Sequence, residues 1–271
     1  MDNVLDGIYK KIGTYTGVIK DAVINVEEKE GKVVFSGVSN KNLKDICIEY
    51  FDLNRNYEDI KKTLNLVDDN VAKSIEYGSG IRILNQDLWE CIISFIISAN
   101  NNIPRIKKII ERISMKYGKE LEFMGKKYYT FPTVEELSKA TVQDLRELGL
   151  GFRDVRVYET TKKILNKQVD IEKLHSITDS NILREELLKL DGVGEKVADC
   201  IMLFSTLKRL EVFPVDVWVR RVMNELYIKA EDENKVNKEQ IRKLAEEKYK
   251  NLAGIAQQYL FYWKREENKA G

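Results

Sequence analysis

Apolar and polar positions along the chain change their spacing once, close to residue 40. Within residues 15–35 they alternate, in the runs TYTGVI and AVINVEE, and the turn-like EKEGK then leads into KVVFSG. Alternation with a period of two is typical of half-buried strands, so this stretch predicts a small antiparallel sheet. From residue 43 onward apolar residues recur three and four positions apart, beginning with residues 43–50. That spacing predicts helices.

The helical part of the chain contains one segment unlike the others. Residues 84–100 are apolar on almost every side, which is typical of a central buried helix. Residues 103–117 are amphipathic, and Thr133 and Thr141 each precede an acidic residue by three positions, as in a capping box. Further helices are expected at 152–167, 180–189, 194–207, 216–227, 237–249 and 252–266.

These patterns predict a fold class and a division of the chain. The protein is expected to be mainly α with a small antiparallel β amino-terminal part. We expect residues 1–38 to form the β-rich subdomain and residues 39–271 to form a two-lobed helical body. A length of 271 residues suits about two domains or one elaborated domain.

Composition removes several classes of protein. Hydrophobic residues make up 43% and charged residues 33%, a globular balance that excludes general disorder. Cys47, Cys91 and Cys200 cannot supply four thiolates, which excludes an iron–sulfur cluster held by cysteine alone. The longest apolar run, residues 91–99, is far short of the ~20 residues that cross a bilayer. With no signal-peptide layout in MDNVLDGIYKK, we expect a cytoplasmic protein with no membrane contact.

Charge is informative through its distribution. The formal net charge is +1, but basic residues are concentrated in the segment 101–170. Taken alone, such a run is most often a solvated helix face. The basic residues of its first part are Arg105, Lys107, Lys108, Arg112, Lys116 and Lys119.

The most specific pattern is LKLDGVGEKVADC, which places a Leu-x-Gly-Val-Gly hairpin between two expected helices at about 181–207. Gly192 and Gly194 lack Cβ atoms, so backbone amides can approach a phosphate at a helix amino terminus. Such a hairpin binds DNA through its backbone without reading bases. Taken alone, an ordinary tight turn between helices explains the two glycines equally well.

Two further residues favour chemistry at this hairpin. Lys196 lies on the first turn of the second helix, where partial burial and the helix amino terminus both favour the neutral, nucleophilic amine. Asp216 follows Pro214 at an expected helix N-cap. Taken singly, Lys196 is explained as a surface lysine and Asp216 as a helix cap. Their joint occurrence after the hairpin favours an active site.

The matched stretch LDGVGEKVADCIMLF followed by PVDVWV resembles the helix-hairpin-helix (HhH-GPD) glycosylase superfamily, and within it the 8-oxoguanine DNA glycosylase/lyase family. The resemblance extends over roughly residues 40–266. It implies that Lys196 attacks C1′ of the damaged nucleotide and that Asp216 supports the charge that develops there. It also implies double-stranded damaged DNA as the partner, a monomer, and no metal or organic cofactor.

The same resemblance assigns DNA- and base-binding residues. ISANNNIPRI is similar to the segment beside the gap left by an extruded base, and LGLGFRDVRVYE to the segment with an aromatic wedge and its arginine. GIAQQYLFYW is similar to the helix that supplies a glutamine and an aromatic residue to the base. The implied DNA-binding residues are Asn100, Asn101, Asn102, Arg105, Phe152, Arg153, Gly192, Gly194 and Trp218, and the implied base-binding residues are Gln257, Phe261 and Cys200.

Several of these positions also have structural explanations. Phe261 and Trp218 are equally explained as core residues, Gln257 as a helix former, and Cys200 as a small core hydrophobe that contacts the lysine or the base. Trp218 stands where animal members of the family carry a histidine, so an imidazole contact is not implied.

The sequence departs from the family at its amino terminus. There the family carries a Gly-Gln-x-Phe-Arg segment whose glycine carbonyl accepts from the N7–H that only 8-oxoguanine has. No glycine here is followed by glutamine, so we expect a shortened or differently built sheet and weaker damage selectivity. The alternatives are a glycosylase for another lesion, an AP lyase with weak base choice, and a non-catalytic helix-hairpin-helix DNA-binding module.

Overall fold

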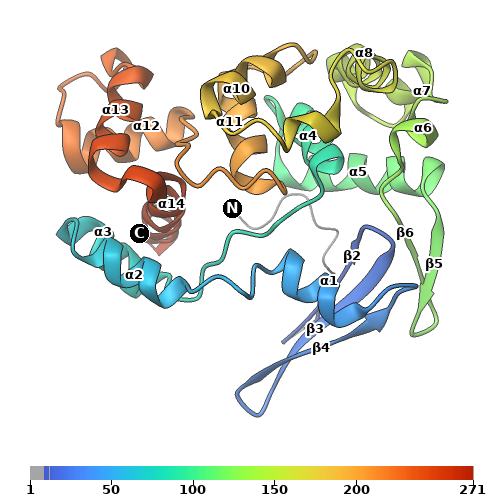
Figure 1. Cartoon of the computed structure of the whole chain (residues 1–271), viewed down its shortest axis with the longest axis horizontal. Coiled ribbons are helices and arrows are strands. Elements are labelled where there is room, and N and C mark those ends of the chain that lie inside the picture. The colour runs from blue at the N-terminus through green and yellow to red at the C-terminus, as the bar shows by residue number, and fades with distance from the viewer. Residues whose placement is uncertain (1–8, 12, 271) are drawn as a thin grey trace.

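A computed structural model describes residues 9–11 and 13–270, and it confirms a mainly helical chain with a small antiparallel sheet near the amino terminus (Figure 1). The sheet has the order β1-β2-β3-β4 and consists of β1 (Tyr9–Lys11), β2 (Thr14–Ile19), β3 (Ala22–Lys29) and β4 (Lys32–Val38). Two-residue turns join β2 to β3 and β3 to β4. In the second turn Glu30 and Gly31 both have positive φ, which matches the right-handed twist of the paired strands.

The inner face of the sheet is covered by the first helix, α1 (Leu43–Tyr50). Ile19, Ala22 and Ile24 from the strands form a small separate core with Cys47 and Tyr50 from α1. α1 presents its apolar stripe to this face. The alternation in the sequence does not extend to burial in β3, because the four consecutive residues 22–25 are all buried and both faces of the strand are covered there.

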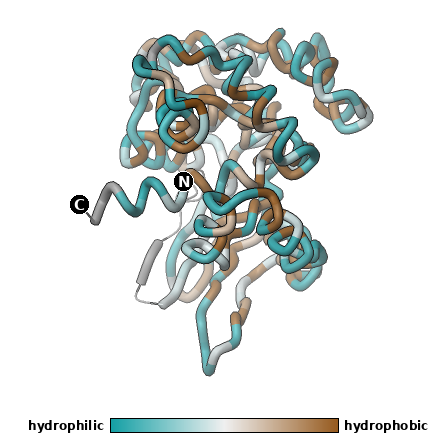
Figure 2. Tube along the Cα trace, turned by 90° about the vertical axis from the view of Figure 1, so that its left-hand side faces the viewer, coloured by the Kyte–Doolittle hydropathy of each residue, from teal (hydrophilic) through white to brown (hydrophobic). Residues whose placement is uncertain are grey.

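The remaining elements build a larger helical body around α4 (Figure 1). Hydrophobic and hydrophilic residues alternate along the helices of this body (Figure 2), and α4 is buried on nearly every side. α4 packs against α5, α8 and α11, and the carboxy-terminal helix α14 packs against α3. The elements of this body are α2 (Tyr57–Asn65), α3 (Asp69–Tyr77), α4 (Leu88–Ser98), α5 (Ile103–Tyr117), β5 (Glu120–Phe123), β6 (Lys126–Tyr129), α6 (Val134–Leu137), α7 (Val142–Glu147), α8 (Asp154–Leu165), α9 (Ile171–Leu174), α10 (Ser180–Leu188), α11 (Glu195–Phe204), α12 (Val217–Met223), α13 (Lys238–Tyr249) and α14 (Ala253–Ala270).

Most differences from the predicted elements lie at helix ends. The central helix begins at Leu88 rather than near residue 84, because Asp87 caps it by accepting from the Glu90 amide at 3.1 Å. It ends at Ser98, two residues before the left-handed backbone of Asn100. The helix expected at 216–227 ends at Met223 and continues as a π-helical turn. Both predicted capping boxes are present, at Thr133 and Thr141.

The β5–β6 hairpin was not predicted, because its strands are short and mostly charged on the outer side. In the part of the chain that the structure describes, no helix combines the length and the apolar character needed to cross a bilayer.

Candidate active site and nucleic-acid interface

A tight hairpin at residues 191–194 joins α10 to α11, as the sequence predicted. Gly192 has φ +83°, and a Cβ at this position would lie 3.1 Å from Ile96 of α4, so both backbone conformation and packing require glycine. Gly194 is the N-cap of α11 but supplies no capping side chain, and nothing lies within 4 Å of where its Cβ would be. The first amides of α11 therefore remain available to an anion at an open surface.

Lys196 lies directly behind this hairpin, on the first turn of α11. Its side chain is half-buried, and its Nζ lies 5.7 Å from the centre of the Phe95 ring on α4. One turn later Cys200 is 1% exposed. Burial raises the pKa of the Cys200 thiol to about 11, partly opposed by the charge and hydrogen bond of Lys196. The Cys200 thiol is therefore under the influence of the Lys196 charge, and a contact of Cys200 with the base stays a prediction.

Asp216 approaches the same group from the start of α12. Its Oδ1 accepts from the Val219 amide at 2.8 Å, which makes it the predicted N-cap. The negative charge of Asp216 also raises the pKa of the Cys200 thiol, so both charged residues act on that thiol. The charges of Lys196 and Asp216 therefore both reach the Cys200 thiol, although twenty positions separate the two residues in the sequence.

Gln257 on α14 is tied to the segment that carries Asp216. Its side chain is buried, and its Nε2 donates to the Pro214 carbonyl at 2.7 Å. Phe261, one turn later, packs edge-on against Trp218 with ring centres 6.4 Å apart. The indole Nε1 of Trp218 is buried and has no hydrogen-bond partner among the described residues. Gln257 and Phe261 border a small cavity of about 10 Å³, room for about one water molecule, so a base needs these side chains to move apart.

The Asn100–Asn102 segment forms the link from α4 to α5. Asn101 donates to the Ile97 carbonyl at 3.0 Å, and Asn102 caps α5 by accepting from the Arg105 amide at 3.0 Å. Asn100 is exposed and has φ +50°. Asn101 and Asn102 therefore shape the turn, and the exposed Asn100 is the one whose side chain makes neither of these bonds.

Phe152 and Arg153 have opposite environments although they are neighbours. Phe152 is 55% exposed, as expected of a wedge, whereas Arg153 is 1% exposed. Arg153 donates to the carbonyls of Ala99, at 2.8 Å from Nε, and of Asn100, at 2.6 Å from Nη2. Burial and the nearby Arg105 and Arg156 lower its pKa. Arg153 thus supports the backbone of the asparagine segment, and a direct contact of Arg153 with DNA stays a prediction.

The basic run of α5 is only partly available to a ligand. Arg105 donates to the Gly149 carbonyl, Arg112 to the Leu148 carbonyl, and Lys116 pairs with Asp144 at 2.7 Å. These contacts attach α5 to α7 and to the loop before Phe152. Much of the charge thus serves packing, in line with the alternative of a structural helix face.

Two neighbours of the site were missed in the sequence. Arg156 lies 5.2 Å from the Phe152 ring and packs against Gly192, so it connects the wedge to the hairpin. Its spacing of four residues from Phe152 in a helical segment was a usable signal. Phe95, beneath Lys196, lies in a uniformly apolar helix, and no local pattern distinguishes it from its neighbours.

A hairpin with open helix-start amides, followed by a half-buried lysine and by an aspartate that caps the next helix, is typical of a helix-hairpin-helix DNA glycosylase. Residues 93–251 match the model of the HhH-GPD superfamily of base excision DNA repair proteins. Residues 8–92 match the N-terminal domain of 8-oxoguanine DNA glycosylase. The chain belongs to the HhH-GPD superfamily and carries this N-terminal domain, so it is a DNA N-glycosylase/lyase.

Similar proteins cover most of the chain. A probable N-glycosylase/DNA lyase of Methanothermobacter thermautotrophicus is 34% identical over 83% of this chain and 75% of its own length. The N-glycosylase/DNA lyase of Saccharomyces cerevisiae is 37% identical over 68% of this chain and 52% of its own. The structure of Clostridium acetobutylicum 8-oxoguanine glycosylase/lyase with double-stranded DNA containing cytosine opposite 8-oxoG is 44% identical, with a TM-score of 0.89 over 96% of this chain and 88% of that chain.

The amino-terminal sheet matches the family's N-terminal domain although it lacks the Gly-Gln segment. Because residues 8–92 match the family's N-terminal domain, the sheet is related to the one the family uses. Gly13 and Gly17 lie in the described sheet region without a following glutamine, and Gly7 lies outside the described residues.

Proposed function

We propose that this protein is a bifunctional glycosylase/AP lyase that excises 8-oxoguanine from duplex DNA and then cuts the strand. The observation that carries the proposal is the half-buried Lys196 directly behind the hairpin, packed over the Phe95 ring, with Asp216 fixed at the start of the next helix. Phosphate binding alone requires neither a half-buried amine on an aromatic ring nor a carboxylate at the start of α12. A non-catalytic DNA-binding module therefore leaves this arrangement unexplained.

Binding and base extrusion come before the chemistry. Amides at Gly192–Gly194 would hold backbone phosphates and fix the register of the duplex. Extrusion of the nucleotide costs a few kcal/mol, and the exposed ring of Phe152 would fill the vacated stack beside Asn100. The expelled base would open the wall formed by Gln257 and Phe261. Gln257 would then exchange its bond to Pro214 for the edge of the base.

The neutral amine of Lys196 would attack C1′, forming the C–N bond as the bond to the base breaks. The base leaves with the electron pair and takes up a proton. The carboxylate of Asp216, fixed by its cap on Val219, would stabilise the positive charge at the sugar. Opening of the sugar ring then gives an imine to Lys196. Loss of a proton from C2′ expels the 3′ phosphate by β-elimination.

The proposal extends to the oligomeric state, the DNA substrate and the cellular location of the enzyme. We expect it to act as a monomer on double-stranded damaged DNA, in the cytoplasm and, in a bacterium, at the nucleoid. A measurement of molar mass in solution, at the concentration used for the activity assay, tests whether the protein is a monomer.

The test is incubation with duplexes that carry 8-oxoguanine, other oxidised bases or an abasic site, with borohydride present to trap the imine. The wild-type enzyme should give a covalent adduct and excision that is fastest at 8-oxoguanine. Lys196→Gln should give neither adduct nor cutting while binding the duplex within a few-fold of wild type, because the hairpin is unchanged. An adduct at the wild-type rate in that variant means that another amine is the nucleophile. Adduct on the abasic duplex alone means an AP lyase.

A further inference from the structure

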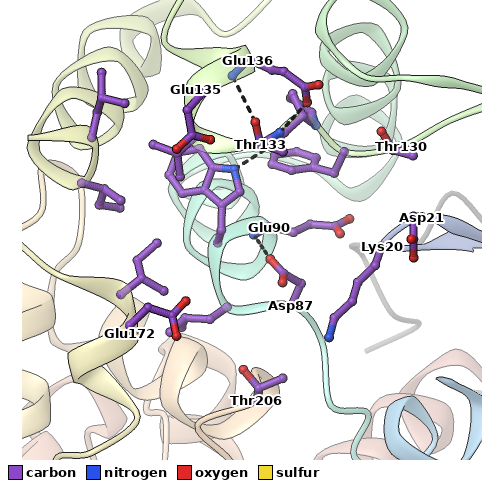
Figure 3. Close-up of a pocket in the computed structure, with 18 of the residues that line it drawn as sticks. Lys20, Asp21, Asp87, Glu90, Thr130, Thr133, Glu135, Glu136, Glu172 and Thr206 are labelled. Atoms are coloured by element: carbon purple, nitrogen blue, oxygen red, sulfur yellow. Dashed lines mark hydrogen bonds between the residues drawn. The ribbon is translucent and has the colours of Figure 1, made fainter. Parts of the chain in front are cut away.

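A second concave surface lies at the opposite end of α4 from Lys196. It is a groove of about 790 Å³, which is within the usual range for ligand sites (Figure 3). The start of α4, at Asp87–Glu90, forms one wall, and the β2–β3 turn at Lys20–Asp21 forms another. The active-site lysine contacts Phe95, further along the same helix. At ~1.5 Å per residue, α4 separates the groove from the hairpin end by more than one helical turn.

The floor of the groove is apolar and firmly built. Trp89 is largely buried, and its Nε1 donates to the Pro132 carbonyl at 2.9 Å, which fixes the segment after β6 against α4. The other apolar lining residues include Leu88, Phe131, Val134, Leu165 and Ile171. A fixed apolar floor of this kind suits an aliphatic side chain of a ligand.

The rim of the groove is acidic, in contrast to the hairpin end. Eight carboxylates line it against four lysines. Two of those lysines form only long pairs, Lys20 with Glu49 at 3.7 Å and Lys119 with Glu136 at 3.8 Å. Among the described residues the exposed carboxylates of Glu135 and Glu172 have no ion pair or hydrogen bond.

The β2–β3 turn adds an unsatisfied acceptor. Asp21 Oδ1 is buried and has no hydrogen-bond partner within the described chain. A buried carboxylate oxygen without a donor carries a free-energy cost, which a cationic or N–H-bearing ligand removes.

We propose that this acidic groove docks a short basic segment of a protein partner. Lysine or arginine side chains would pair with Glu135 and Glu172, an aliphatic side chain would pack on the floor beside Trp89, and a donor would reach Asp21. The negative charge of DNA is repelled by this acidic rim. Residues 1–8 of the chain contain two aspartates and no basic residue, so their charge does not complement the groove either. Because the hairpin lies at the other end of α4, docking leaves the DNA site open.

The test uses a fluorescent peptide of alternating lysine and leucine, with a lysine–serine and a glutamate–leucine peptide of equal length beside it. The full-length protein should bind the first peptide saturably, the second at least several-fold more weakly, and the third not at all. Affinity should fall with added salt, as expected for exposed charges. Among the three indole N–H signals in nuclear magnetic resonance spectra, that of Trp89 should shift and that of Trp218 should not.

The variant is Glu135→Lys with Glu172→Lys, and the matched control is Glu246→Lys with Glu247→Lys on the exposed face of α13. Both change net charge equally. The groove variant should weaken peptide binding by about tenfold or more at low salt, and the control by less than about twofold. Both should excise at the wild-type rate, which keeps this test independent of the proposed function. Equal losses in the two variants, no saturable binding, or an unshifted Trp89 signal would overturn the proposal.

Discussion

Arg153 Nη2 donates to the backbone carbonyl of Asn100 at 2.6 Å, and Asn100 holds a left-handed backbone with φ +50°. The same guanidinium binds the carbonyls of Ala99 and Leu150. Burial of a guanidinium is favourable only when its N–H groups have hydrogen-bond acceptors. Here backbone carbonyls accept those hydrogen bonds. The wedge at Phe152 and the asparagine segment are therefore positioned as one unit.

Replacement of Arg153 tests this coupling. Arg153→Met leaves the buried Leu150 carbonyl and the partly buried carbonyls of Ala99 and Asn100 without these donors, and we expect the free energy of unfolding to fall by about 2–3 kcal/mol. Single-turnover excision should slow at the same time, because Asn100 is released. Arg153→Lys should recover part of both losses, since an ammonium still donates to one or two of the carbonyls. Urea unfolding measures the first effect, and unchanged stability in Arg153→Met contradicts the supporting role.

Asp216→Asn separates charge from capping. Both residues cap helices well, so thermal stability should change little. Loss of the negative charge should slow base excision by on the order of 10²-fold or more, as when a preorganised charge is removed from a transition state. Single-turnover excision and thermal melting are measured on the same preparation. A large loss of stability with an unchanged excision rate would identify Asp216 as a cap only.

Damage selectivity should be reduced relative to family members that carry the Gly-Gln segment. Gln257 and the cost of extrusion do not test N7–H, and one missing buried hydrogen bond is worth roughly 0.5–1.5 kcal/mol. That corresponds to about a two- to twelvefold weaker preference for 8-oxoguanine over guanine. Single-turnover excision from both duplexes, before and after a family Gly-Gln segment is joined to Met1, measures it. Full selectivity in the unmodified chain would mean that another acceptor reads N7–H.

Lys208 gives the protein a defined pH response. Its side chain is 10% exposed, its Nζ lies 3.6 Å from Asp52 Oδ2, and it donates to the Leu84 carbonyl. Burial lowers the pKa of Lys208 to about 8, although Asp52 acts in the opposite direction. Because the folded-state pKa lies below the unfolded value, the charged form is penalised in the folded protein. That penalty is complete below about pH 8 and is relieved as pH rises toward the unfolded value near 10.4.

The effect is measured as the difference in unfolding free energy between the wild type and Lys208→Met. From about pH 8 to pH 9.5 the unfolding free energy of the wild type should rise by about 1–2 kcal/mol relative to that of Lys208→Met, which lacks the group. Taking the difference cancels the titration of the cysteines and tyrosines that both proteins share. A difference that stays constant or shrinks over this range would show that Lys208 is not desolvated in the folded state.

Local patterns predicted much of this protein. Alternation at 15–35 and three-to-four spacing from residue 43 predicted the sheet and most helices, because the period of side-chain direction is set by the backbone of each element. The hairpin was predictable because only glycine suits its conformation at Gly192. Lys196 and Asp216 were identified from their position after that hairpin, together with a resemblance to a known family.

Tertiary structure decided what depends on distant contacts. Nothing near Arg153 in the sequence indicates that it is buried, since its partners Ala99 and Asn100 belong to a segment more than fifty positions earlier. The position of the Gln257 side chain depends on its bond to Pro214, and the acidic groove is assembled from the β2–β3 turn, the start of α4 and the segment after β6. Local periodicity states which face of an element is buried. Only the packing of elements from distant parts of the chain decides which charged groups lie close together. It also decides whether each group supports the backbone, binds a ligand or takes part in the reaction.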